Sequence, residues 1–398
     1  MTSTTNPVGH EVPPDVPVPE LLTLVLNQGA SDLHLTVGSP PVIRLHGDLI
    51  RLDQYPILTQ QGLRAMVYAI LPQRRREQLE QDLELDMSYS LPGKARFRVN
   101  VYFQRDSIGA AFRLIPHEIK SVVDLGLPEV VTELARYPRG FICVTGPTGS
   151  GKSTTLAALV DVVNVERKAH IMTVEDPIEF LHQHKNSIVN QREVGADTHG
   201  FAPALKHVLR QDPDVILVGE MRDLETIQTA ITAAETGHLV FATLHTQDAP
   251  QAIDRIIDVF PPHQQQQVRV QLSTTLQGVV TQQLLQTATG GGRVVASEVL
   301  IATSAVRNLI REGKVHQIYS MMQSGGRFGM QTMDASLAEL VRSRTITQAL
   351  AMERSHDPEE LNRLLGSASA GPAPAVSATG NGGGGYVIGG AMSGGRNG

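Results

Sequence analysis

Two kinds of hydrophobic pattern follow one another along the chain. Near Pro19 a helix is predicted to begin, because apolar residues recur there at helical spacing, Leu21, Leu22, Val25 and Leu26. From Ser31 to about Arg113 the pattern changes to short apolar segments. These predict strands at 32–36, 42–46 and 94–103, helices around 59–71 and 73–82, and a hairpin turn at 91–94. A small mixed α/β module is therefore expected in this part of the chain.

From about Ser121 onward, continuous apolar runs alternate with helical patterns. The runs occupy residues 141–145, 170–174, 215–219, 239–243 and 294–300. Short, fully apolar strands separated by helices predict a parallel sheet that is covered by helices on both faces. Ligands of such sheets bind beyond the carboxyl ends of the strands, so a binding site is expected where these runs end.

The two ends of the chain differ from both patterns. Residues 1–19 are polar and proline-rich and are expected to form a flexible leader. Residues 366–398 are rich in glycine and carry no acidic residue, so they cannot bury enough apolar surface to order themselves and are expected to be disordered. Between these ends, the sequence predicts an N-terminal domain over 20–115 and a second domain over 116–365.

Composition narrows the class of protein. The 398 residues are 41% hydrophobic and 19% charged, which is ordinary for a globular protein. A net charge of −6 provides no basic field and argues against a nucleic acid as the main partner. The single cysteine, Cys143, excludes an intramolecular disulfide and a multi-cysteine zinc site, and its apolar surroundings predict a core residue. No secretory signal and no membrane span of about 18 apolar residues is recognisable, so we expect a cytoplasmic protein that meets a membrane only through a partner.

A complete phosphate-binding loop follows the apolar run at 141–145. It consists of Gly146, Pro147, Thr148, Gly149, Ser150, Gly151, Lys152, Ser153 and Thr154. A glycine-rich turn between a strand and a helix lets backbone N–H groups surround phosphate oxygens, and the helix points its positive end at the same anion. Lys152 is expected to reach the β and γ phosphates and Ser153 to ligate Mg²⁺. The sequence therefore predicts ATP and Mg²⁺ as ligands.

Acidic residues follow two further apolar runs. Glu220 comes directly after the run at 215–219, where a carboxylate can orient Mg²⁺ or polarise the attacking water. Nearby Asp223 is better explained as the cap of the next helix. Glu175, Asp176 and Glu179 cluster after the run at 170–174, and one of them can align or deprotonate water for attack on the γ phosphate. The alternative for this cluster is a solvated acidic loop.

Two histidines flank the run at 239–243 and lie at its opposite ends. His245 follows the carboxyl end, where the phosphates are expected, and is predicted to sense the γ phosphate. His238 stands beside Gly237, where a helix is expected to end, and a structural role is as good an explanation for it as a catalytic one.

The N-terminal module carries the arginines Arg96, Arg98, Arg105 and Arg113, far in sequence from the phosphate loop. Surface arginines usually face solvent. An arginine supplied across a subunit boundary can instead stabilise the charge that develops during phosphoryl transfer. That second interpretation requires a ring or another oligomer.

With these residues in view, the chain resembles the secretion-type ATPases from about Leu21 to Leu365. The motifs that match are the phosphate loop at 146–154, an acidic box at 174–180, a second acidic motif at 212–223, a histidine box at 237–246, and shorter stretches at 29–35, 305–312 and 329–334. Within this family, the stretch from Gly219 to Asp223 is similar to the branch that retracts type IV pili, whereas assembly and secretion relatives more often carry Ile in place of Met221. Those relatives also commonly carry a longer N-terminal region and a four-cysteine zinc site.

The resemblance implies an α/β fold with a RecA-like ATPase core, a PAS-like N-terminal domain and a homohexameric ring at the base of the pilus. It implies that Glu179 is the acid nearest catalysis and that Glu220 supports Mg²⁺. The arginine that the family places near position 106 is Arg105 here and is followed by Asp106, whereas Arg96, Arg98 and Arg113 keep the family pattern better. The implied function is an ATPase motor for pilus retraction and twitching motility.

The implied partners are an inner-membrane platform protein and, as a further possibility within the family, an assembly ATPase or a retraction paralogue. Three alternative functions stay open at this point. A pilus-assembly or type II secretion ATPase would use the same chemistry with the opposite output. An accessory paralogue would bind ATP, join rings with a true motor and turn over little. A nucleic-acid translocase is disfavoured by the net charge.

Overall fold

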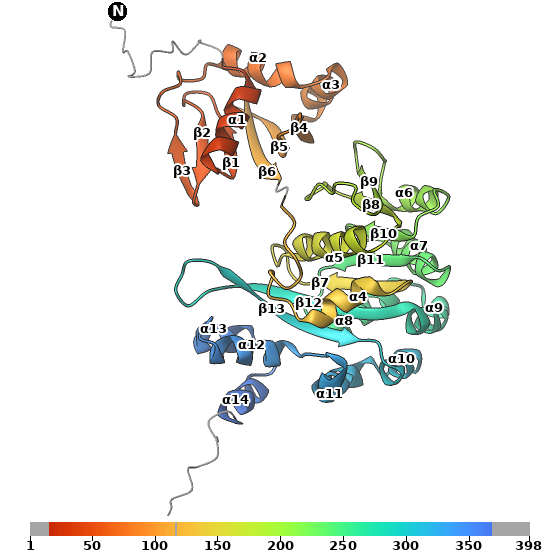
Figure 1. Cartoon of the computed structure of the whole chain (residues 1–398). Coiled ribbons are helices and arrows are strands. Elements are labelled where there is room, and N and C mark those ends of the chain that lie inside the picture. Colours follow the sequence, from red (N-terminus) through yellow and green to blue (C-terminus); the bar gives the residue numbers. More distant parts are fainter. Residues whose placement is uncertain (1–15, 116–117, 368–398) are drawn as a thin grey trace, which may run out of the picture.

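The computed structural model describes residues 16–115 and 118–367. Residues 1–15 of the predicted leader and 368–398 of the predicted tail therefore lie outside the described residues. Two β-sheets, each with its own helices, form an N-terminal domain and a larger second domain (Figure 1). Among the helices described, none combines the length and the apolar character that crossing a membrane requires.

The N-terminal domain is built on a six-stranded antiparallel sheet with the order β3-β2-β1-β6-β5-β4. Its strands are β1 (Asp32–Leu35), β2 (Val42–Leu45), β3 (Asp48–Arg51), β4 (Glu84–Leu91), β5 (Ala95–Gln104) and β6 (Ser107–Ile115). Its helices are α1 (Val18–Gln28), α2 (Gln60–Ile70) and α3 (Gln73–Asp82). The strands predicted at 32–36, 42–46 and 94–103 and all three helices are confirmed.

Local sequence explains most of these elements. Helix α1 begins after Pro17, buries Leu21 and Leu22, and ends at Gly29, whose φ of 66° is the left-handed conformation that glycine adopts without steric cost. Strand β5 alternates, with Phe97 fully buried and its neighbour Arg98 exposed. Strand β3 was not predicted. All four of its residues are exposed, so it lacks the alternation of buried and exposed positions that marks a strand.

The second domain contains a seven-stranded sheet with the order β13-β12-β7-β11-β10-β8-β9. Its strands are β7 (Gly140–Thr145), β8 (His170–Glu175), β9 (Ile188–Glu193), β10 (Val215–Val218), β11 (Leu239–Leu244), β12 (Leu276–Gln286) and β13 (Arg293–Ile301). Its helices are α4 (Glu129–Arg136), α5 (Lys152–Glu166), α6 (Phe201–Val208), α7 (Leu224–Glu235), α8 (Ala249–Asp258), α9 (Pro262–Thr275), α10 (Ser304–Arg311), α11 (Ile318–Ser324), α12 (Met333–Arg342), α13 (Gln348–Arg354) and α14 (Pro358–Ser367), with short 3₁₀ turns η1 (Val315–Gln317) and η2 (Gly326–Phe328).

The prediction of a parallel sheet is confirmed for β7, β8, β10 and β11, and β9 and β12 extend it in the same direction. It is wrong for β13, which runs antiparallel to β12. The reason is the connection between the two strands. Only residues 287–292 separate them, and so short a link reverses the chain, whereas a parallel neighbour needs a crossover of a dozen or more residues.

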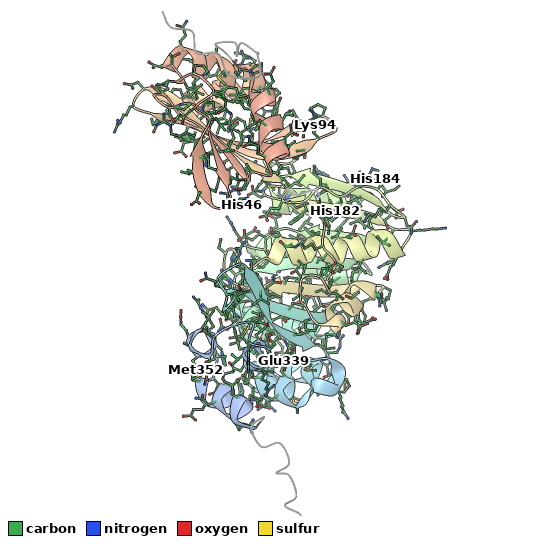
Figure 2. All side chains as sticks on the ribbon, turned by 60° about the vertical axis from the view of Figure 1, so that its left-hand side comes forward. His46, Lys94, His182, His184, Glu339 and Met352 are labelled. Carbon is green, nitrogen blue, oxygen red and sulfur yellow. The ribbon has the colours of Figure 1, made fainter. Side chains whose placement is uncertain are left out.

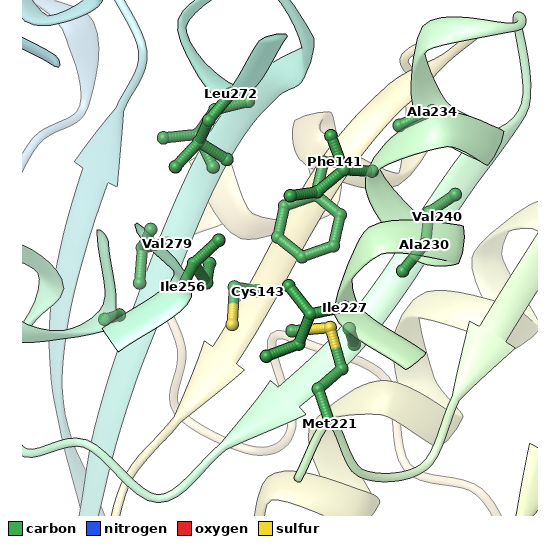
Figure 3. Packing of buried hydrophobic residues seen from close by; sticks show 14 of the residues in the cluster. Phe141, Cys143, Met221, Ile227, Ala230, Ala234, Val240, Ile256, Leu272 and Val279 are labelled. Atoms are coloured by element: carbon green, nitrogen blue, oxygen red, sulfur yellow. The ribbon is translucent and has the colours of Figure 1, made fainter. Parts of the chain in front are cut away.

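Helices cover both faces of this sheet, as predicted. On one face, Phe141, Cys143 and Val240 pack against Ile227 of α7 and Ile256 of α8 (Figure 3). On the opposite face, the alternate residues of the same strands pack against α4 and α5. Cys143 is fully buried, which confirms its place in the core, and burial raises the pKa of its thiol. A further cluster joins α12, α13 and α14 to β12 and β13.

The two domains also meet each other. A cavity of about 430 Å³ lies between the β4–β5 hairpin, from Ser90 to Ala95, and residues Leu181 and Gln183 of the second domain. Figure 2 shows Lys94 of this hairpin beside the segment that carries His182 and His184. The N-terminal domain therefore contacts the second domain close to the predicted acidic box.

Candidate active site

The phosphate loop has the backbone conformation that its glycines predict. Gly149 and Gly151 adopt φ values of 78° and 91°, and helix α5 begins directly afterwards at Lys152. A side chain at Gly146 would collide with the carbonyl oxygen of Gln282 and would lie 2.7 Å from Ser150 Oγ. The loop therefore requires glycine at these positions, and it directs the positive end of α5 into the cavity that the loop borders.

Lys152 is buried beneath this loop. Its Nζ donates to the carbonyl oxygens of Gly146, at 2.8 Å, and Pro147, at 3.0 Å. Desolvation lowers the pKa of Lys152, and the nearby carboxylates of Glu220 and Glu179 oppose that effect. The ammonium group is thus held by two hydrogen bonds to the backbone of the loop.

Gln282 on β12 forms hydrogen bonds with the phosphate loop and the start of α5, and this role was not predicted from the sequence. Its Oε1 accepts from Thr155 Oγ1 and its Nε2 donates to the backbone oxygen of Ser150, both at 2.8 Å. The residue is only 2% exposed. A buried amide that satisfies two groups of the loop fixes the loop's backbone relative to the sheet. The one available signal was a polar tract, Thr281 to Gln283, inside an otherwise apolar strand.

Glu220 follows strand β10, as predicted, and is held by two neighbouring side chains. The Arg222 side chain binds it at 2.5 and 2.6 Å, and His245 Nε2 lies 3.1 Å from its Oε1. Partial burial pushes the pKa of Glu220 upward, but the hydrogen bond and the charge of Arg222, with His245, hold it below its usual value. Glu220 is therefore ionised at neutral pH. Asp223 accepts from the backbone N–H of Thr226, which confirms the interpretation of Asp223 as a helix cap.

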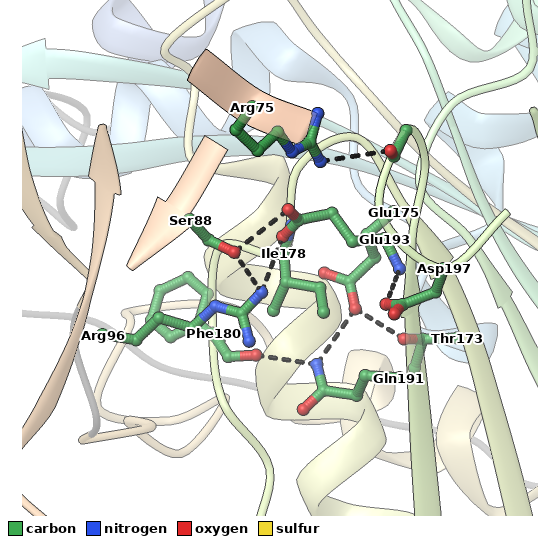
Figure 4. Close-up of polar contacts among 11 residues, drawn as sticks. Arg75, Ser88, Arg96, Thr173, Glu175, Ile178, Phe180, Gln191, Glu193 and Asp197 are labelled. Atoms are coloured by element: carbon green, nitrogen blue, oxygen red, sulfur yellow. Dashed lines mark hydrogen bonds and ion pairs between the residues drawn. The ribbon is translucent and has the colours of Figure 1, made fainter. Parts of the chain in front are cut away.

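The acidic box places Glu175 and Glu179 in different surroundings. Glu175 ends β8 and accepts from Thr173 Oγ1, at 2.6 Å, and from Gln191 Nε2, at 3.0 Å (Figure 4). Desolvation raises its pKa. Glu179 is exposed, and its carboxylate interacts with the charge of Lys152. An exposed carboxylate beside the phosphate loop is accessible to water, whereas Glu175 is already engaged by the protein.

One cavity of about 370 Å³ brings the predicted groups together. It is lined by the phosphate loop and by Glu175, Glu179, Glu220 and His245, which all lie at or directly beyond the carboxyl ends of neighbouring strands. Other residues of its lining were not predicted from the sequence. These are chiefly Phe180, His182, Phe201, Leu284 and Arg293.

The remaining predicted site residues lie outside the lining of this cavity. His238 stands at the opposite end of β11, and its Nδ1 lies 2.9 Å from the carbonyl oxygen of Ala233. Arg96 binds Glu193 of the same chain, and Arg113 Nε lies 2.8 Å from Asp32 Oδ1. Arg98 is exposed. Within one chain, then, neither His238 nor these arginines reach the phosphate loop, and their predicted catalytic roles stay predictions.

The cavity suits a nucleotide phosphate and its magnesium ion. Gly149 leaves open space before the start of α5, since a side chain there would meet nothing within 4 Å. Ser153 and Glu220 offer oxygen ligands of the kind that Mg²⁺ prefers. Within residues 16–115 and 118–367, no group of three or more His, Cys, Asp or Glu side chains is arranged to hold a metal. Phosphate and water would therefore have to complete the coordination.

Known proteins are similar in sequence to most of this chain. The family described as type II/IV secretion system protein matches residues 18–351. The Pseudomonas aeruginosa type IV pilus retraction ATPase PilT is 52% identical over 342 residues, which cover 86% of this chain and 99% of that protein. The Neisseria gonorrhoeae twitching motility protein is 50% identical over 322 residues, or 81% of this chain and 86% of that protein.

Among solved structures, the crystal structure of the pilus retraction motor PilT with bound ADP is similar, with a TM-score of 0.82 and 50% identity. The similarity covers 87% of this chain and 99% of that one. It confirms the predicted fold, a RecA-like ATPase core preceded by a smaller α/β domain. It also agrees with a nucleotide as the ligand of the 370 Å³ cavity.

Proposed function

Because the chain belongs to the type II/IV secretion system protein family, we propose that it hydrolyses ATP to power the retraction of type IV pili. The single observation that carries the chemistry is the convergence of Lys152, Glu179, Glu220 and His245 on one cavity beside the phosphate loop. The direction of the output rests on the relatives, which are named for pilus retraction and twitching motility and are matched over most of their length.

The residues divide the chemistry among them. Lys152 exchanges the carbonyl oxygens of Gly146 and Pro147 for the β and γ phosphates of ATP. Glu179 accepts a proton from the attacking water, because it is an exposed carboxylate that lines the cavity and whose charge acts on Lys152. Ser153 and Glu220 would hold Mg²⁺, which neutralises phosphate charge when bound.

Nucleotide binding is expected to change the contact between the domains. We place the boundary between them at residues 115 and 116 and propose that the N-terminal domain rotates against the ATPase domain when the γ phosphate binds. Lid and domain closure of this kind is a common way to couple a reaction to movement.

A homohexameric ring is the assembly that fits this mechanism. Arg96, Arg98 and Arg113 belong to the N-terminal domain and lie away from the cavity of their own chain. In a ring, a neighbouring N-terminal domain could present such an arginine to the transferred phosphate, where it would stabilise the transition state. His238 is a second residue whose catalytic role would require the ring.

The ring is proposed to act at the cytoplasmic face of the inner membrane, bound to the platform protein of the pilus machine, with ATP as its substrate. A pilus-assembly or secretion ATPase and a low-turnover accessory paralogue are the alternatives. No nucleic acid is expected as a partner, since the chain carries a net charge of −6.

Counting surface pili by electron microscopy tests the proposal. We expect more pili than in the wild type, together with lost twitching motility, both in a strain that lacks the gene and in a Lys152→Ala strain. Bald cells would assign the protein to assembly instead. Normal pili with slow ATP turnover by the purified protein would favour the accessory paralogue.

A further inference from the structure

The buried carboxylate of Glu193 connects the N-terminal domain to the acidic box of the second domain. Glu193, the last residue of β9, is 4% exposed. Its Oε2 accepts from Arg96 Nη2, at 2.9 Å, and its Oε1 accepts from Ser88 Oγ, at 3.1 Å. The same Oε2 also accepts from the backbone N–H of Ile178, at 3.3 Å. Figure 4 shows Glu193 between the strands of the N-terminal domain and the segment of Ile178 and Phe180.

The sheet fixes Glu193 on the side of the ATPase domain. It lies opposite Glu175 in the parallel pairing of β8 and β9. The backbone N–H of Glu193 donates to Asp197 Oδ2, at 2.9 Å, and the N–H of Val194 donates to the carbonyl oxygen of Glu175, at 2.8 Å. The backbone of Glu193 is therefore held by its own domain, and its side chain is the part that the N-terminal domain contacts.

The N-terminal domain provides the two side chains that bind the Glu193 carboxylate. Arg96 and Ser88 lie on the adjacent strands β5 and β4, and Arg96 Nη2 also donates to Ser88 Oγ, at 2.5 Å. The Arg96 side chain is 18% exposed and that of Glu193 is 5% exposed. Removing one partner of a buried ion pair leaves an uncompensated charge, which is costly. When Arg96 leaves, the carboxylate of Glu193 must therefore find water or reorient.

We propose that Glu193 is a positioning residue that makes the placement of Glu179 depend on the docking of the N-terminal domain. Ile178, whose N–H the carboxylate holds, directly precedes Glu179 in the chain. Glu193 is absent from the lining of the nucleotide cavity, so it acts through the backbone rather than on the substrate. This inference rests on the proposed ATP hydrolysis.

A second contact between the domains provides a matched control. Arg75 Nη2 donates to the carbonyl oxygen of Gly195, at 3.2 Å, and so binds the turn that follows β9 (Figure 4). It has no hydrogen bond to Glu193 or Ile178 among those of the described residues. An Arg75→Ala variant removes a domain contact at nearly the same place but leaves both the Arg96–Glu193 ion pair and the bond to Ile178 intact.

The experiment measures kcat, KM, ADP affinity and thermal unfolding for the full-length wild type, Glu193→Ala, Glu193→Gln and Arg75→Ala. We expect Glu193→Ala to lower kcat by about 10- to 100-fold with ADP affinity within about threefold, since a small misplacement of a catalytic group has an effect of this size. Glu193→Gln keeps a neutral acceptor and is expected to recover part of the loss. Arg75→Ala is expected to retain the kcat of the wild type.

Amide hydrogen exchange supplies a readout that is independent of turnover. In Glu193→Ala, exchange is expected to rise at Ile178 and its neighbours but not across the core strands. An unchanged kcat, a parallel loss of ADP binding, or exchange that rises throughout the protein would each overturn the proposal. A wild type that binds ADP but does not hydrolyse ATP would refute the proposed function instead, and the exchange at Ile178 would still decide the role of Glu193.

Discussion

His245 lies between Lys152 and Glu220 and contacts both, with Nδ1 3.5 Å from Lys152 Nζ and Nε2 3.1 Å from Glu220 Oε1. An ammonium group only donates hydrogen bonds, so Nδ1 is the acceptor in the contact with Lys152, and Nε2 is the ring nitrogen that faces Glu220. The ring therefore connects the phosphate-binding lysine to the carboxylate that follows β10. A γ phosphate that attracts Lys152 would change the contact between Lys152 and His245.

The histidine is therefore expected to affect turnover more than binding. His245→Ala should lower kcat by roughly 100-fold, the effect typical of one positioned polar group in an active site. ADP affinity should change by less than about threefold, because the backbone of the loop supplies most phosphate contacts. His263→Ala, a change at an exposed histidine on α9, is the control. Equal activities of the two variants in a steady-state ATPase assay would contradict the role of His245.

Glu179 is expected to be the general base. Glu179→Gln should reduce kcat by about 10²- to 10⁴-fold, since a general base contributes that much. ADP binding should persist, as measured by calorimetry. Glu175→Gln is the informative comparison, because the carboxylate of Glu175 already accepts hydrogen bonds from Thr173 and Gln191. Retained hydrolysis by Glu179→Gln would move the role of the base to Glu175 or Glu220.

The arginines of the N-terminal domain are expected to act across subunits. Lys152→Ala subunits keep these arginines, whereas Arg98→Ala subunits keep an intact phosphate loop. Mixing the two inactive proteins should restore part of the ATPase activity, because some boundaries in a mixed ring then combine both intact parts. The same mixing with Arg96→Ala and Arg113→Ala identifies which arginine contributes. Activity that stays at the sum of the separate proteins would exclude a contribution in trans.

Gln282 is expected to stabilise the phosphate loop. Gln282→Ala leaves Thr155 Oγ1 and the carbonyl oxygen of Ser150 without their partner, and a lost buried hydrogen bond costs about 1–3 kcal/mol. Denaturant unfolding should show this loss, and ADP should bind several-fold more weakly. Gln283→Ala changes the next residue, which lies on the other face of β12 and is only half-buried. A similar loss in both variants would point to the strand rather than to the loop.

Stability is expected to depend on the titration of Glu298, a fully buried residue of β13. Its Oε1 accepts from the N–H of Ala249, at 2.7 Å, and desolvation, with the charges of Asp248 and Asp334, raises its pKa to about 7. The folded state therefore favours the protonated form. The contribution of Glu298 to stability is fully present below the ordinary glutamate pKa, and about 3 kcal/mol of it is lost as the pH rises through 7.

Glu298→Gln keeps an acceptor for Ala249 and removes the titration. The melting temperature of the wild type should fall more between pH 5 and pH 8 than that of the variant. Parallel pH profiles of the two proteins in thermal unfolding would show that Glu298 does not control this dependence.

The nucleotide site was predictable from sequence because its parts are local. Glycines that require a positive φ, an apolar strand before them and a helix after them are all encoded within residues 141–166. Glu220 and His245 were recognisable for the same reason, since each directly follows a short apolar run. Parallel strands then bring their carboxyl ends to one edge of the sheet, which gathers these residues without any further information.

Tertiary structure alone decided the contacts that join distant segments. Gln282 supports Ser150 across 132 residues, and Arg96 reaches Glu193 across 97. Strand β13 likewise took its direction from the hairpin with β12 rather than from its apolar pattern. Periodicity and turn chemistry specify the conformation of one segment at a time. Which side chains meet between segments depends on sheet order, register and domain docking, and these follow only from the packing of the whole chain.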